Sequence, residues 1–284
     1  RLDRLFAPFE GTRDPLPLAI VRIAFFAGLF LHFAPSLLWL DIGYGHGAVR
    51  ADAWNHWLFS HLWRIPPAAL RARALVTLAA CIAGIAGWRT RIAAIVAFAG
   101  CYAFASFNSI HLQTLALIPA WAILLLWMIC GGGGETWSID ARLARGRPPA
   151  RASRLPCGLI LFQVLLAVFF SGVEKLLHGW PWTDEMGIIL AYPRGFMVRD
   201  WVAALPILHG AAVSNALTWG TLAVELGAPI LLLVRRTRIA ALVVYELFFL
   251  GIIAMLEVPP LFYFIFASAP VLALDDAELA SAAR

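Results

Sequence analysis

The sequence predicts an all-α protein, a polytopic bundle of about eight transmembrane helices. Hydrophobic residues make up 62% of its 284 residues and charged residues only 14%, a balance that excludes an ordinary soluble domain. Its net charge of +5 comes from arginines in short segments between apolar runs, which indicates membrane orientation rather than nucleic-acid binding. We therefore expect a single transmembrane domain over residues 1–284, without a separate soluble domain.

Eight apolar runs are the candidate spans of a hydrocarbon core about 30 Å thick. The second of them is short, and tryptophans with polar residues between some runs indicate segments at the membrane interface, at 41–67 and 178–208. The expected spans are residues 15–40, 74–87, 92–107, 111–130, 156–177, 212–234, 239–256 and 259–274.

Basic residues predict the orientation of these spans. With the amino terminus inside, the inner segments hold 14 basic residues and the outer segments hold seven. Because inner loops are enriched in lysine and arginine, we expect both termini to be cytoplasmic. His111 then begins the fourth span and Lys175 ends the fifth, so both are expected at the outer face.

Lys175 ends a long apolar run and is the only lysine in the chain. Arginine keeps its proton, whereas a desolvated lysine can become a neutral amine and act as a base. The alternative is a lysine that extends from a helix end to the lipid headgroups. Ser171, Lys175 and His178 follow one another at i, i+4 and i+7, so we expect a hydroxyl and an imidazole near the amine.

Three further charged residues lie in predicted spans away from the span ends: Arg22, Glu225 and Glu246. Arg22 either reaches the membrane surface or has a buried partner such as a carboxylate from a later helix. A structural ion-pair set between helices would explain all three charges. The spacing of cysteines and histidines matches no metal-ligand pattern, so we expect no metal site.

Four short motifs, in order along the chain, resemble those of the vitamin K-dependent gamma-carboxylase and its bacterial relatives built on the HTTM (horizontally transferred transmembrane) domain. Residues 18–22 resemble the opening of the first helix, and residues 108–112 resemble an asparagine-histidine motif. Residues 172–176 with Trp180 resemble the catalytic motif, and residues 224–229 resemble a later pattern of an acid followed by proline.

This resemblance implies a reduced quinone, vitamin K or another membrane quinol, as cofactor. In the carboxylase, a lysine at the place of Lys175 deprotonates the quinol, whose oxygenation yields a strong base that prepares a glutamate for carbon dioxide. The histidine at the place of His111 assists, and we expect it to act as a neutral ring that faces the same outer cavity as Lys175. By the same resemblance, Glu225, Ser171, Trp180 and Asn108 are expected to bind the cofactor.

The sequence departs from the carboxylase pattern where it has Glu174 in place of a second lysine and Thr183 in place of a glycine. We also expect no counterpart of the carboxylase's long lumenal portion, so that recognition of a peptide or protein substrate would need a separate subunit. We expect an integral membrane enzyme, with membrane lipid and quinone as partners, in a bacterial inner membrane and with its site at the periplasmic face. The alternative is a non-enzymatic membrane protein, either a transporter or a maturation partner of another protein.

Overall fold

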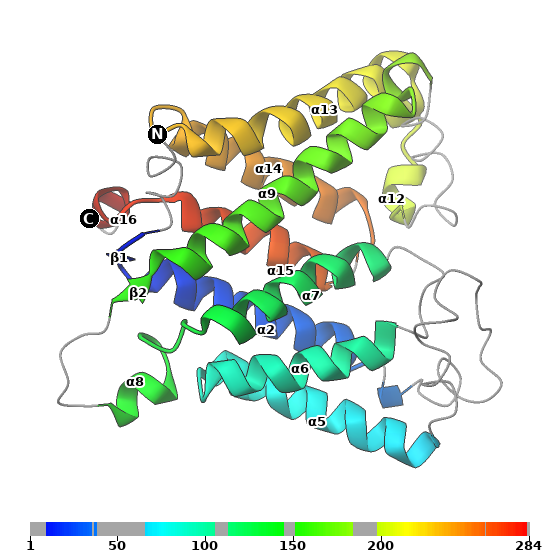
Figure 1. Ribbon diagram of the computed structural model, residues 1–284. Coiled ribbons are helices and arrows are strands. Elements are labelled where there is room, and N and C mark those ends of the chain that lie inside the picture. The colour runs from blue at the N-terminus through cyan, green and yellow to red at the C-terminus, as the bar shows by residue number, and fades with distance from the viewer. Residues whose placement is uncertain are drawn as a thin grey trace. The chain divides into compact units, whose positions relative to one another are not determined.

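A computed structural model describes most of the chain and is built almost entirely of helices (Figure 1). One short antiparallel ribbon joins β1 (Thr12–Arg13) to β2 (Ala152–Ser153). The described residues are 10–35, 37–38, 66–105, 113–144, 151–183, 198–258 and 260–282.

The described chain forms two compact units that share α9 (Arg154–Leu177). The first unit consists of residues up to 163 together with the segment from 259 onward, and the second consists of residues 164–258. The division falls inside α9, so this helix contributes its beginning to one unit and its end to the other. The single-domain assignment stays a prediction.

In the first unit, α2 (Leu16–Phe33) packs against α15 and α5, and the helices from α5 to α7 pack in chain order. The elements that accompany α2 in this unit are α5 (Pro67–Ala86), α6 (Thr90–Ala105), α7 (Gln113–Cys130), α8 (Ile139–Leu143), α15 (Pro260–Ser268), η5 (Ala269–Ala273) and α16 (Asp276–Ala282).

Glycines let α2 approach its neighbours closely. A Cβ atom at Gly84 of α5 would lie only 2.4 Å from the ring of Phe26, and one at Gly28 would lie 2.6 Å from Cβ of Phe264. Small residues at such crossings allow tight helix packing where lipid supplies no hydrophobic driving force between helices. Phe26 and Phe25 also pack against Trp127, with ring centroids 5.7 Å and 5.1 Å apart.

Contacts distant in sequence fasten one end of this unit. Arg13 donates from Nη1 to the carbonyl of Leu272 at 2.7 Å and from Nη2 to the carbonyl of Leu274. Arg151 pairs with Asp276 at 2.7 Å, although both side chains are exposed and the pair contributes little by itself. These bonds join Arg13 of β1 to the end of η5, and Arg151 to the start of α16.

The second unit contains a hairpin of α13 (Ala211–Leu233) and α14 (Arg238–Met255), against which the end of α9 packs through its polar residues. Thr237 and Arg238 donate side-chain hydrogen bonds to carbonyls of the last turn of α13, so these otherwise unpaired groups have partners. The short elements of this unit are η3 (Trp180–Trp182), α12 (Asp200–Ala203) and η4 (Pro206–His209).

The carboxyl end of α14 is closed by Arg199 and the first turn of α12. Arg199 donates from its backbone N–H to Met255 at 3.0 Å and from Nε to Ile253 at 3.1 Å. Trp201 donates from Nε1 to Ala254 at 3.2 Å. The last carbonyls of the helix are therefore satisfied by one short segment.

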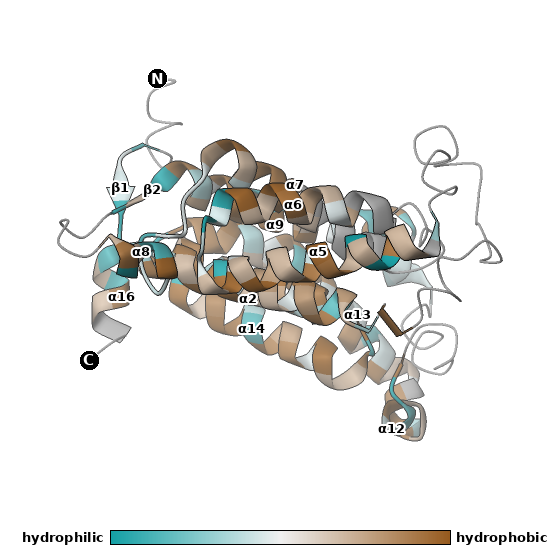
Figure 2. Ribbon diagram, turned by 90° about the horizontal axis from the view of Figure 1, so that it is seen from below, coloured by the Kyte–Doolittle hydropathy of each residue, from teal (hydrophilic) through white to brown (hydrophobic). Residues whose placement is uncertain are grey.

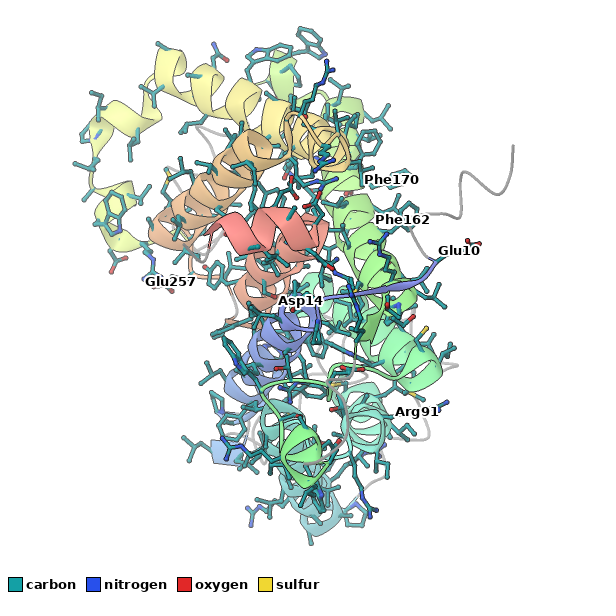
Figure 3. All side chains as sticks on the ribbon, turned by 90° about the vertical axis from the view of Figure 1, so that its left-hand side faces the viewer. Glu10, Asp14, Arg91, Phe162, Phe170 and Glu257 are labelled. Carbon is teal, nitrogen blue, oxygen red and sulfur yellow. The ribbon has the colours of Figure 1, made fainter. Side chains whose placement is uncertain are left out.

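Apolar surface identifies the chain as an integral membrane protein. Figure 2 shows hydrophobic residues along the full length of the long helices. Leu247 of α14 is 62% exposed, and Phe162 and Phe170 of α9 are more than half exposed and project from the same side of that helix (Figure 3). So much exposed apolar surface is unfavourable in water and rare on soluble proteins, whereas it is favourable in contact with lipid.

Among the described residues, five helices are long and apolar enough to cross a membrane. The helical fold is thus confirmed, while the number of eight spans and the cytoplasmic termini stay predictions. The second helix begins at Pro67 rather than near residue 74, and the expected last span is divided into α15 and η5. The five helices are Leu16–Phe33, Ala68–Ala86, Arg154–Leu177, Ala211–Leu233 and Arg238–Met255, and the shorter apolar helices are Thr90–Cys101 and Pro260–Ala273.

Candidate functional site

Lys175, in the last turn of α9, forms an ion pair with Glu225 of α13. Its Nζ lies 2.8 Å from both carboxylate oxygens of Glu225. The same nitrogen donates to the hydroxyl of Ser171 at 2.6 Å, and that hydroxyl lies 3.3 Å from Oε1 of Glu225. The four-residue spacing of Ser171 and Lys175 places them one above the other on the helix, which explains why the sequence predicts this contact.

The ion pair is largely removed from solvent. The side chain of Lys175 is 19% exposed and that of Glu225 is 9% exposed. Coulombic attraction is stronger in such surroundings than in water, but the cost of taking both charges out of water offsets much of it. The pair is therefore not by itself evidence of high stability. Its two groups are, however, close enough to share a proton.

Gly172 permits the close approach of α9 and α13 at this pair. A Cβ atom at this position would lie 2.9 Å from Cδ2 of Leu226 and 3.0 Å from Cβ of Glu225. A larger residue would push the two helices apart and lengthen the contact between ammonium and carboxylate. The glycine is a positioning residue for the pair.

The aromatic ring of Trp180 lies close to the amine of Lys175. Gly179 adopts a left-handed conformation, with φ of 79°, and ends α9 so that the chain turns into η3. The Trp180 ring centroid then lies 5.4 Å from Nζ of Lys175, within the range of a cation–π contact. Nearby in the chain, Trp182 makes an edge contact with Trp219 of α13 at 6.0 Å, and both rings are at least half exposed.

The other residues that were predicted to lie near Lys175 are His178, His111 and Asn108. His178 is exposed, and its Nδ1 lies 2.8 Å from the carbonyl of Glu174, so its ring bonds to its own helix rather than to the amine. His111 and Asn108 lie outside the described residues. Their positions relative to Lys175, and the idea of a shared site with His111, stay predictions.

Arg22 occupies a second buried polar centre, in the first unit. It is fully buried and donates to the carbonyls of Gly84 at 3.1 Å, Ile85 at 3.2 Å and Trp137 at 2.6 Å. Arg22 is thus buried with partners from later in the chain, as one of the two alternatives expected, but its described hydrogen bonds go to backbone carbonyls, and the carboxylates of Glu135 and Asp140 act on it through their charge. The reason is local, because Gly84 and Ile85 lie in the last turn of α5, where few helical N–H groups remain to donate to the carbonyls.

Tyr245 is a polar residue that was not selected as a candidate from the amino-acid sequence. It is fully buried in α14, where Ala241, Tyr245 and Phe249 form one buried face at four-residue spacing. Within the described part of the chain, its hydroxyl has no hydrogen-bond partner. The only feature of the sequence that could have indicated Tyr245 is a phenol in the middle of an apolar run, and an ordinary core aromatic residue gives the same pattern.

The geometry of the Lys175 site is compatible with proton transfer. An ammonium, a carboxylate and a hydroxyl lie within hydrogen-bond distance of one another, an arrangement in which one group can give a proton to the next. In the described ranges, no group of three or more histidine, cysteine or acidic residues is arranged to hold a metal ion.

A family model for the HTTM domain matches residues 11–276, nearly the whole chain. The chain belongs to the HTTM family. No curated protein and no solved structure matched it in the corresponding comparisons. The HTTM match agrees with the resemblance drawn from the motifs around Arg22, Lys175 and Glu225, and it makes this chain a membrane protein related to the carboxylase family.

Proposed function

We propose that this HTTM protein is a membrane enzyme that deprotonates a reduced quinone, with Lys175 as the base. The observation that carries the proposal is the buried pair of Lys175 and Glu225, in which the only lysine of the chain has a proton acceptor in direct contact. Arginine could supply the same charge but not the same chemistry, because it does not release its proton.

Glu225 gives the lysine a route to its neutral form. A nearby carboxylate ordinarily holds a lysine in its charged form and opposes its action as a base. At 2.8 Å, however, a proton can move from Nζ to the carboxylate, which leaves a neutral amine and a neutral carboxylic acid. The loss of both charges lowers the cost of their burial. The amine then takes the proton of a quinol O–H, and the quinolate anion is the product of this step.

The residues around the pair suit a quinol. The aromatic ring of the quinol can stack on Trp180 beside the amine of Lys175. Two further tryptophans of the same unit, Trp182 and Trp219, contact each other nearby in the chain. The quinol O–H needs the polar group that Lys175 supplies. When bound, the cofactor would supply an anion that reacts with oxygen, and the resemblance assigns further roles in binding and assistance to Asn108 and His111. The site would lie at the periplasmic face of a bacterial inner membrane.

Oxygen consumption tests this proposal. The purified protein in lipid nanodiscs is supplied with vitamin K hydroquinone, and oxygen uptake is compared between wild type and Lys175→Met. We expect quinol-dependent uptake that the variant lacks. Radioactive carbon dioxide with a glutamate-containing peptide then shows whether carboxylation follows, alone or after a co-purifying subunit is added. Uptake that is equal in both proteins would exclude Lys175 as the base.

The ion pair also favours a second candidate, a non-enzymatic membrane protein in which Lys175 and Glu225 only hold α9 and α13 together. A transporter or a maturation partner would need no deprotonated lysine. Lys175→Arg would then preserve function, because arginine also pairs with a buried carboxylate. This candidate predicts no quinol-dependent oxygen uptake by the wild-type protein.

A further inference from the structure

The hydroxyl of Tyr245 is an unpaired polar group in the interior of the second unit. The residue is fully buried, and in the described structure its hydroxyl makes no hydrogen bond. Its ring packs at 4.7 Å against Phe249, so the aromatic part is well accommodated. A buried hydroxyl without a partner is unfavourable and calls for an explanation. Phenylalanine would avoid this cost at nearly the same volume.

Tyr245 and Glu225 lie at similar distances from the turn that joins α13 and α14. Glu225 is eight residues before the end of α13 at Leu233, and Tyr245 is seven residues after the start of α14 at Arg238. With a rise of about 1.5 Å per residue, the two are roughly 12 Å and roughly 10 Å from the turn. Both belong to the buried faces of their helices. The charged groups that interact with the phenol are the carboxylates of Glu246 and Glu225.

We propose that Tyr245 is a positioning residue that hydrogen-bonds Glu225 whenever Lys175 leaves the ion pair. The inference rests on the proposed function for its catalytic consequence. When the amine turns toward a substrate, Glu225 loses its principal partner inside an apolar hairpin. A phenol can donate to the carboxylate while Glu225 is charged and accept from it once Glu225 carries the proton. It therefore serves both states of the proton transfer.

Glu246 is the competing partner. It follows Tyr245 directly in the chain, is partly exposed, and therefore points in a different direction around α14. Glu225 is buried on the helix that packs against α14. A buried carboxylate that has lost its cation has more to gain from the phenol than a carboxylate with access to the surface. The experiment must still separate the two acids.

Infrared spectroscopy of the protein in nanodiscs makes this separation without any substrate. Lys175→Met removes the ammonium, and Glu225 is then expected as a buried neutral carboxylic acid, whose C=O stretch is assigned by its loss in Lys175→Met/Glu225→Gln. Adding Tyr245→Phe should shift this band to higher frequency, because a hydrogen bond to the carboxyl group is lost. Tyr263→Phe, on α15 of the first unit, is the matched control and should leave the band in place. Lys175→Gln replaces Lys175→Met if the latter does not fold.

Two spectroscopic outcomes would overturn the inference. An unchanged band in the Tyr245→Phe background would show that the phenol does not reach Glu225. A band that shifts with Tyr245→Phe but disappears with Glu246→Gln rather than with Glu225→Gln would assign the phenol to Glu246 instead.

Kinetics test the catalytic consequence. With Lys175 intact, Tyr245→Phe should lower kcat for quinol oxidation about 10- to 150-fold and leave KM for the quinol unchanged, the loss expected for one hydrogen bond to a charged group. Tyr263→Phe should keep wild-type kcat, and an unchanged kcat for Tyr245→Phe would contradict the positioning role. If the wild-type protein oxidises no quinol, the proposed function fails, while the infrared result still decides whether Tyr245 binds Glu225.

Discussion

Nζ of Lys175 lies 2.8 Å from each carboxylate oxygen of Glu225, so two helices separated by a long stretch of chain meet at a single buried charge pair. The pair does two things at once. It joins the end of α9 to the middle of α13, and it places a proton acceptor beside the only lysine. A structural role needs only the first property, whereas catalysis needs both.

Removal of the acceptor should separate these properties. Glu225→Gln keeps the size and a hydrogen-bonding oxygen but leaves the ammonium without its counter-charge. We expect the free energy of unfolding to fall by about 3 kcal/mol, as for other broken buried pairs, and quinol oxidation to be lost. Thermal unfolding in detergent and oxygen uptake measure the two effects. If the Glu225→Gln variant retained turnover, Glu225 would be excluded as the acceptor of the Lys175 proton.

Gly172 should control the distance between the two helices. Gly172→Ala places a methyl group 2.9 Å from Leu226 and 3.0 Å from Cβ of Glu225, and we expect a loss of about 1–2 kcal/mol from overpacking. Turnover should fall as the ion pair lengthens. Gly227→Ala is the matched control, because a Cβ atom there meets nothing within 4 Å. Equal effects of the two substitutions on melting temperature and turnover would refute the close-approach argument.

The sequence predicted those parts of the site that depend on local spacing. Ser171 and Lys175 are four residues apart, so helix geometry alone brings them together. Glu225 was placed in the site only through the family resemblance, and its contact with Lys175 was not predicted, because a meeting of two helices depends on packing that spacing does not encode. Gly172 was noticed as part of a motif, but its contact with Glu225 could not be foreseen. Tyr245 was missed because a phenol in an apolar run looks like any core aromatic residue.

Helix ends were harder to predict than helices. The second span was expected to begin near residue 74, yet α5 begins at Pro67, a residue well suited to a first helical turn. Arg73 remains in the helix because arginine is a good helix former and its guanidinium donates to the carbonyl of Ala99 at 2.9 Å. In the last expected span, the helix tightens into η5 around Pro270, where proline removes a backbone donor.

The Arg22 centre can be tested with two glycines of the first unit. Gly87 and Gly131 both have left-handed φ values, of 65° and 69°, so alanine brings similar backbone strain at either site. At Gly87, however, a Cβ atom would overlap Nη1 of Arg22 at 1.9 Å, whereas at Gly131 it meets nothing within 4 Å. We expect Gly87→Ala to lower the melting temperature well beyond Gly131→Ala. Similar melting temperatures would show that Arg22 does not anchor the end of α5.

Lys175→Arg is the sharpest test of the proposed base, because it changes chemistry while it preserves charge. The guanidinium can form two parallel hydrogen bonds with the Glu225 carboxylate, so we expect the variant to fold and insert with a melting temperature close to that of the wild type. Trp180 can stack on the planar group as it stacks on the ammonium. A guanidinium does not release its proton to Glu225, so oxygen uptake with vitamin K hydroquinone should fall at least about 100-fold, the lower range for loss of a general base. Quinol binding, measured by quenching of tryptophan fluorescence, should persist. Near-normal turnover by the arginine variant would leave the Lys175–Glu225 pair with a structural role only.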